Sequence, residues 1–100
     1  MIHQEDIINF LYDNQNYFKN HFYITKMALF GSFARNEESE EGDIDLIVDF
    51  EENTSQLFEL KQELREYLTN QFNWKVDIAR EKYLKSSMKK EILQEAIYID

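Results

Sequence analysis

The order of apolar and polar residues along the chain predicts helices that alternate with strands. Apolar residues recur at helical spacing over 6–18, over 54–70 and over 86–96, so each range predicts an amphipathic helix. The side chains expected to form the buried stripes of the second and third helices are Leu57, Leu60, Leu64, Leu68, Met88, Ile92, Leu93 and Ala96.

Three other ranges read as strands. Residues 22–30 and 72–79 are rich in β-branched and aromatic side chains, and residues 43–50 alternate cleanly between apolar and polar. A short helix from 32 to about 36 and an acidic loop over 37–42 separate the first two strands. The order α-β-α-β-α-β-α predicts an α/β (α+β) fold with a sheet covered by helices, while the order of the strands stays open.

Length and composition narrow the class of protein. One hundred residues predict one domain, 1–100, with a single core built from eight Phe, six Tyr and one Trp. The absence of Cys excludes disulfides and thiolate metal sites. Since no apolar run reaches the ~20 residues of a membrane span and the first twenty residues do not resemble a signal peptide, we expect a cytoplasmic protein without membrane contact.

The formal net charge of −9 argues against direct binding to nucleic acid, which favours a basic face. It agrees better with a small-molecule site in which a divalent cation offsets the negative charge, or with docking onto a basic partner. Solubility alone is the simpler explanation of the same charge.

The most informative segment contains both glycines of the chain, Gly31 and Gly42. Gly31 and Ser32 follow the first strand, and after ten further residues Asp43 and Asp45 open the second. A glycine at a strand end lets the backbone approach a ligand closely. The pattern therefore predicts an anion site beside two carboxylates.

Asp43 and Asp45 are two residues apart on a strand, so their side chains leave one face with Cβ atoms roughly 6–7 Å apart. Two carboxylates this close repel each other unless a cation lies between them or one is protonated. Oxygen ligands of this kind suit Mg²⁺ or Mn²⁺. Asp77, the acidic residue within the apolar run of the third strand, is the natural third ligand, although an acid on an edge strand can also simply face solvent.

The other half of the expected site binds phosphate. Backbone N–H groups after Gly31 and the hydroxyl of Ser32 can donate to phosphate oxygens, and Arg35 can do so with its forked guanidinium. An ion pair with Glu38 or Glu41 is the alternative for Arg35. A nucleoside triphosphate would bridge both halves, and the natural reaction is in-line displacement at phosphorus between two metal ions.

These residues resemble a known family. The stretch from Leu29 to Arg35, with Gly42-Asp43-Ile44-Asp45-Leu46 and a later Asp77, is similar to the DNA-polymerase-β-like nucleotidyltransferase superfamily. It most resembles its minimal nucleotidyltransferases, the MntA-type antitoxins of HEPN/MNT toxin–antitoxin pairs. The resemblance implies a polymerase-β-like core with a small mixed sheet flanked by helices.

The resemblance also implies roles. Asp43, Asp45 and Asp77 would be catalytic and would bind Mg²⁺, two ions being expected, while Gly31 and Ser32 would hold the β- and γ-phosphates of ATP. Such proteins transfer AMP from ATP to a tyrosine hydroxyl of a cognate HEPN ribonuclease toxin and so neutralise it. Position 42, often Ser or Thr in such motifs, is Gly here.

Two rival functions stay open. One is a nucleotidyltransferase with a small-molecule acceptor such as an aminoglycoside, although 100 residues leave no room for an acceptor-binding domain. The other is an antitoxin that acts by binding alone, against which the presence of all three carboxylates argues. Nucleotide preference, the number of AMP units transferred and the stoichiometry of a complex are not contained in the sequence.

Overall fold

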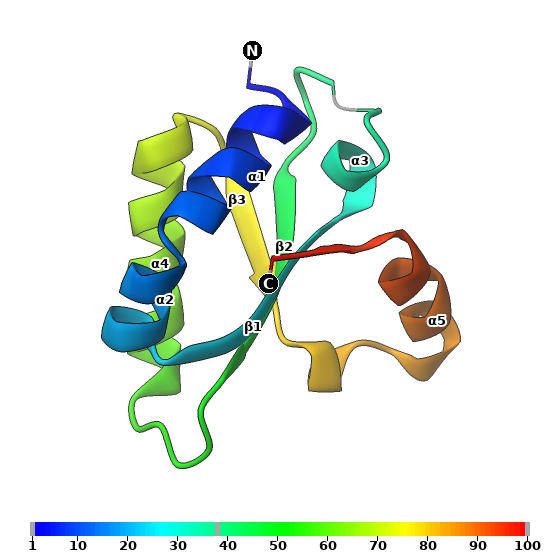
Figure 1. Ribbon diagram of the computed structural model, residues 1–100. Coiled ribbons are helices and arrows are strands. Elements are labelled where there is room, and N and C mark those ends of the chain that lie inside the picture. Colours follow the sequence, from blue (N-terminus) through cyan, green and yellow to red (C-terminus); the bar gives the residue numbers. More distant parts are fainter. Residues whose placement is uncertain (1, 38, 100) are drawn as a thin grey trace.

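The computed structural model describes residues 2–37 and 39–99, which build a four-stranded sheet with helices on both sides (Figure 1). The strands are β1 (Ile24–Phe30), β2 (Ile44–Phe50), β3 (Val76–Ala79) and β4 (Ile97–Tyr98). Their spatial order is β3-β2-β1-β4. Because β1 is antiparallel to both β2 and β4 whereas β2 and β3 are parallel, the sheet is mixed, as predicted.

The helices divide between the two faces of this sheet. α1 (Gln4–Asp13), α2 (Gln15–Phe22) and α4 (Leu57–Phe72) lie on one side, and α5 (Ser86–Glu95) lies on the other (Figure 1). The short α3 (Gly31–Ala34) continues directly from β1, and a 3₁₀ turn, η1 (Glu81–Tyr83), follows β3. Within residues 2–37 and 39–99, no helix is both long and apolar enough to cross a membrane.

The main core lies between the sheet and α1, α2 and α4. Alternation along β2 directs four apolar side chains into it, as the sequence pattern predicts, and α4 contributes an i, i+4, i+8 stripe. Of the four leucines expected in that stripe, Leu57 and Leu60 are only partly buried. The buried members from these two elements are Ile44, Leu46, Val48, Phe50, Leu64, Leu68 and Phe72.

The predicted first helix, 6–18, is wrong as a single element. The chain forms two helices that meet at Asn14, whose backbone leaves helical geometry at φ −114° and ψ 17°. The Asn14 side-chain amide donates to the Phe10 carbonyl at 2.8 Å, so it competes with the helical ladder at this point. The second helix extends to Phe22, and β1 therefore begins at Ile24 rather than at 22.

Three other boundaries differ from the pattern. α3 covers Gly31–Ala34 rather than 32–36, and α4 begins only at Leu57, after Gln56 in the left-handed region. Because α4 continues through the buried Phe72, β3 starts at Val76 instead of 72. The sequence thus located β1, β2 and β3 but misjudged where the preceding helices give way to β1 and β3.

The C-terminal part departs furthest from expectation. α5 buries no side chain, and Met88, which was expected to face inward, is 52% exposed. The chain then adds a strand that was not predicted, since β4 pairs with the free edge of β1 through Ala28–Tyr98 and Leu29–Ile97. Ala96, the last residue of the predicted helix, already has extended backbone geometry, and the strand occupies the two residues after it.

Candidate active site

Three carboxylates lie on the face of the sheet opposite the main core. Asp43 precedes β2 and Asp45 lies within it, and because the fully buried Ile44 between them faces the core, both carboxylates leave the other side. The parallel register of β2 and β3 pairs Asp77 directly with Asp45. A neighbouring strand thus brings Asp77 alongside the pair, as expected.

Negative charge is concentrated at Asp45. Its pKa is raised to about 6, first by burial and then by the nearby charges of Asp77 and Asp43, while Arg35 opposes the shift. Lys75 offers only weak compensation, since its Nζ lies 3.7 Å from Asp43 Oδ2 and its side chain is 79% exposed. A cation placed between these carboxylates would relieve their repulsion.

The donor set fits a hard divalent cation that binds together with a ligand. In the part of the chain that the structure describes, no three acidic or histidine side chains converge into a complete metal cluster. Mg²⁺ typically takes only one or two protein carboxylates and completes its shell with water and substrate phosphates. Oxygen-only donors such as Asp43, Asp45 and Asp77 are the type that Mg²⁺ and Mn²⁺ prefer.

The turn between β1 and α3 packs against the same carboxylates. Gly31 has φ +75°, in the left-handed region, and a Cβ at this position would collide with Asp45 Oδ2. Only glycine therefore lets the backbone pass this close to Asp45. A Cβ on Gly42 would lie 3.4 Å from Ser32 Oγ, so the loop before Asp43 returns to the same turn.

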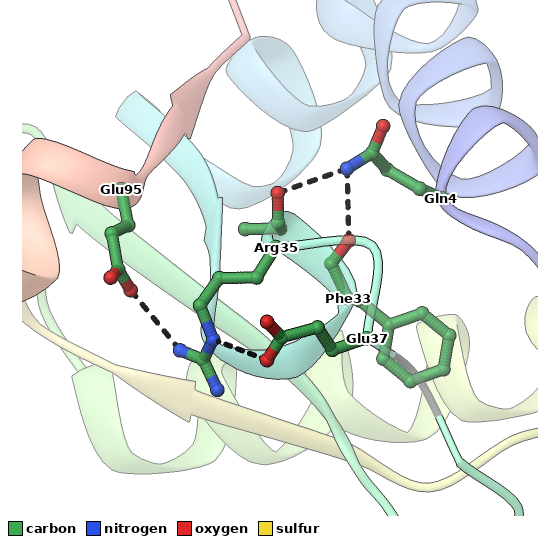
Figure 2. Close-up of polar contacts among 6 residues, drawn as sticks. Gln4, Phe33, Arg35, Glu37 and Glu95 are labelled. Carbon is green, nitrogen blue, oxygen red and sulfur yellow. Dashed lines mark hydrogen bonds and ion pairs between the residues drawn. The ribbon is translucent and has the colours of Figure 1, made fainter.

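Four contacts fix the turn in place. The side chain of Phe33 is completely buried and meets the ring of Trp74 edge-on, with centroids 6.4 Å apart. Gln4 of α1 donates from Nε2 to the carbonyl oxygens of Phe33 and Ala34, both at 3.0 Å (Figure 2). Trp74 Nε1 donates to the Gly42 carbonyl at 2.7 Å. The segment from Gly31 to Gly42 is therefore tied at both ends to the body of the protein.

Arg35 is paired with acids other than those considered from the sequence. Its Nε donates to Glu37 and its Nη1 to Glu95, each at 3.1 Å (Figure 2). Of the two partners expected, Glu41 makes no described bond with Arg35, and Glu38 lies outside the described residues. The positive charge of Arg35 nevertheless partly opposes the rise in the pKa of Asp45.

Comparison with known proteins decides the family. Residues 14–99 match the family model of the nucleotidyltransferase domain. The chain belongs to this family. Protein adenylyltransferase MntA of Thermococcus cleftensis is 34% identical to it over 99 residues, which cover 99% of this chain and 98% of that protein. By homology, the chain is thus a nucleotidyltransferase of the protein adenylyltransferase type.

Solved structures of similar fold support this placement. The fold of this nucleotidyltransferase matches that of a candidate minimal nucleotidyltransferase with a TM-score of 0.78 and 27% identity, covering 96% of this chain and 95% of that one. A protein crystallised as a toxin–antitoxin with AMP-PNP matches with a TM-score of 0.66 and 18% identity, over 99% and 73% of the two chains. The second likeness concerns the fold alone.

Sequence reasoning about this nucleotidyltransferase missed residues that hold the site from a distance. Gln4, Trp74 and Glu95 are 29, 32 and 60 residues from the partners that they bind around the turn. No local pattern marks such contacts. Asp49, near the end of β2, is half-buried, and burial and the nearby Glu81 raise its pKa.

Proposed function

We propose that this nucleotidyltransferase transfers AMP from ATP to a tyrosine hydroxyl of a HEPN-type toxin and thereby acts as an antitoxin. The observation that carries the proposal is the placement of Asp43, Asp45 and Asp77 on one face of the sheet, with the Gly31 backbone packed against Asp45. In the proposed function, this arrangement would set the phosphate site next to the cation site. Residues 1–100 would act as one catalytic unit.

The side chains would divide the work as follows. Asp43 and Asp45 would bind Mg²⁺ (or Mn²⁺), and Gly31 N–H and Ser32 would hold the β- and γ-phosphates. Bound Mg²⁺ ions would stabilise the negative charge that develops on the attacking and leaving oxygens. Asp77 would accept the proton of the acceptor hydroxyl, whose oxygen forms a bond to the α-phosphorus as pyrophosphate leaves.

The choice of a protein acceptor rests on the relatives. The relative from Thermococcus cleftensis is called a protein adenylyltransferase, and the toxin–antitoxin protein with AMP-PNP shares the fold of this chain. The charge of −9 agrees with docking on a basic protein and with the exclusion of nucleic acid as a direct ligand.

The test is intact-mass spectrometry of the purified chain incubated with Mg²⁺, ATP and the product of the adjacent gene. We expect the partner to gain mass in steps of one adenylate, with the gain lost in Asp77→Ala. Asp49→Asn, which alters another partly buried carboxyl on the same face, serves as the matched control and should retain transfer.

Two other results would overturn the proposal. A partner that is bound and inhibited without added mass would favour neutralisation by binding alone. Transfer to an aminoglycoside but not to protein would favour a small-molecule acceptor.

A further inference from the structure

Arg35 sits between two carboxylates that belong to different parts of the chain. Glu37 lies two residues after Arg35, whereas Glu95 is the last residue of α5, 60 positions after Arg35. Both donor–acceptor distances are 3.1 Å, and Figure 2 shows the guanidinium reaching from the end of α3 towards Glu95. The Arg35 guanidinium thus connects the segment after the Gly31-Ser32 turn to α5, which lies on the same side of the sheet as the three aspartates.

These two ion pairs are exchangeable. The side chains of Arg35, Glu37 and Glu95 are 40%, 67% and 48% exposed, so water screens their attraction. A triphosphate carries several negative charges and accepts the forked guanidinium in a bidentate manner, which a surface carboxylate matches poorly. In competition for Arg35, a triphosphate within reach would therefore displace a glutamate.

The backbone around Arg35 is held while its side chain is not. Gln4 binds the carbonyls of Phe33 and Ala34, the two residues before Arg35, and Phe33 is anchored in the core. A change of partner by Arg35 thus needs only side-chain rotation. The Arg35 amide also donates to the Gly31 carbonyl at 3.2 Å, so Arg35 lies one helical turn after the glycine that packs against Asp45.

We propose that Glu95, assisted by Glu37, is a positioning residue that competes with the nucleotide triphosphate for Arg35. Before nucleotide binds, the two carboxylates neutralise the guanidinium and hold it at the end of α5. Triphosphate binding then transfers Arg35 to the phosphates and frees the Glu95 carboxylate. This inference rests on the proposed function, which supplies ATP as the ligand. It assigns to the Glu95 carboxylate the role of lowering the affinity for ATP.

The test measures the Kd of Mg·ATP by titration calorimetry for the whole chain and for Glu95→Gln. We expect Glu95→Gln to bind ATP about twofold to fivefold more tightly, the range that one competing surface ion pair allows. Glu91→Gln is the matched control, since it removes the same charge from the same exposed helix four residues earlier. AMP, which lacks the outer phosphates, should bind both variants and the parent equally.

A second set of variants separates competition from structure. Arg35→Gln should weaken ATP binding, and Glu95→Gln added to it should give no further gain. In steady-state transfer, Glu95→Gln should lower the KM for ATP and leave kcat and the melting temperature unchanged. A purely structural role would move the melting temperature instead.

Several outcomes would overturn the inference. Weaker ATP binding by Glu95→Gln would mean that Glu95 presents Arg35 to the nucleotide rather than withholding it. Equal tightening by Glu95→Gln and Glu91→Gln would reduce the effect to overall charge. If Arg35→Gln leaves the Kd unchanged while Asp77→Ala still abolishes transfer, the inference fails and the proposed function stands.

Discussion

The two faces of the sheet are built from the same strands but have different roles. The core face packs against α1, α2 and α4, and the site face carries Asp43, Asp45 and Asp77. On the core face, β2 contributes Ile44, Leu46 and Val48, all fully buried beneath α1, α2 and α4. On the site face, the alternate positions of β2 include the half-buried Asp45 and Asp49, and α5 lies on this side of the sheet without burying a side chain of its own (Figure 1). One face is packed for stability, whereas the other keeps charged groups close together at an electrostatic cost.

The comparison teaches where each kind of substitution should act. Apolar packing loses free energy when atoms are removed, because the cavity does not fully collapse. When one of several repelling carboxylates is neutralised, the fold should lose little stability, but the proposed cation site would lose part of its charge. Substitutions on the core face should therefore lower stability, and substitutions of the site-face acids should lower activity.

The largest expected effect is on catalysis. Asp45→Asn should reduce AMP transfer about a hundredfold or more, since a metal site supplies several kcal/mol of transition-state stabilisation. Without Mg²⁺, its melting temperature should equal or exceed that of the parent, because the repulsion that raises the pKa of Asp45 is removed. Kinetic assays and thermal melts in EDTA check both arms. A clear drop in melting temperature would contradict the division between the faces.

Next comes the core face. Leu46→Ala should cost about 2–5 kcal/mol of unfolding free energy by chemical denaturation. Ile47, its neighbour in β2, is equally buried but points to the site face and lies outside the main core cluster. Ile47→Ala should fall near the lower end of that range, since the α5 side can relax. Equal costs would show that both faces are packed alike.

A smaller effect is expected at the turn that joins the faces. Gly31→Ala should cost about 1–2 kcal/mol for a side chain in the left-handed region, and it should also impair transfer because its Cβ displaces Asp45. Gly42→Ala is the control, since its Cβ would meet its nearest neighbour, Ser32 Oγ, at an ordinary 3.4 Å. Denaturation and activity assays of both variants give the comparison. Similar losses for the two would rule out the special role of Gly31.

The smallest effect concerns the far end of the site face, where Lys26 Nζ bonds Glu81 Oε2 at 2.9 Å. This bond lowers the pKa of Glu81 from 4.5 and raises that of Lys26 from 10.5. The Glu81 contribution is thus present above pH 4.5 and is lost as pH falls through its lower folded pKa. The Lys26 contribution is present below pH 10.5 and is lost as pH rises through its higher folded pKa.

Lys26→Met should therefore cost at most about 1 kcal/mol between these limits, with the difference from the parent shrinking towards both ends. Burial and Glu81 raise the pKa of Asp49, and this pKa should rise further when the charge of Lys26 is lost. Denaturation across pH, with exposed Lys90→Met as control, measures the difference. A cost that does not vary with pH would point to lost packing instead.

Sequence alone predicted what local patterns record. The alternation of β2 and the leucine stripe of α4 exist because burial repeats with the geometry of each element, so both were recovered. The two-residue β4 has no pattern of its own and is defined by pairing with β1, some 70 residues earlier in the chain. The break at Asn14 depends on one side-chain amide that competes with the helix.

The candidate site divides in the same way. Gly31, Ser32, Asp43 and Asp45 were found together because a strand, a turn and a second strand arrange them locally. Asp77 required the added assumption that β3 lies beside β2, which the register confirms. Two partners of the turn region, Gln4 and Glu95, lie far from it in the sequence, where composition carries no sign of these contacts.

The attachment of α5 has a consequence for local unfolding. The helix is fastened at its ends, by the Glu81–Lys26 pair in η1 before it and by β4 after it, where the Ile99 amide also donates to the Met27 carbonyl at 2.9 Å. Because no side chain between these points is buried, opening α5 exposes little apolar surface. Its amides should exchange with deuterium well before those of β1 and β2, at a free energy below that of global unfolding.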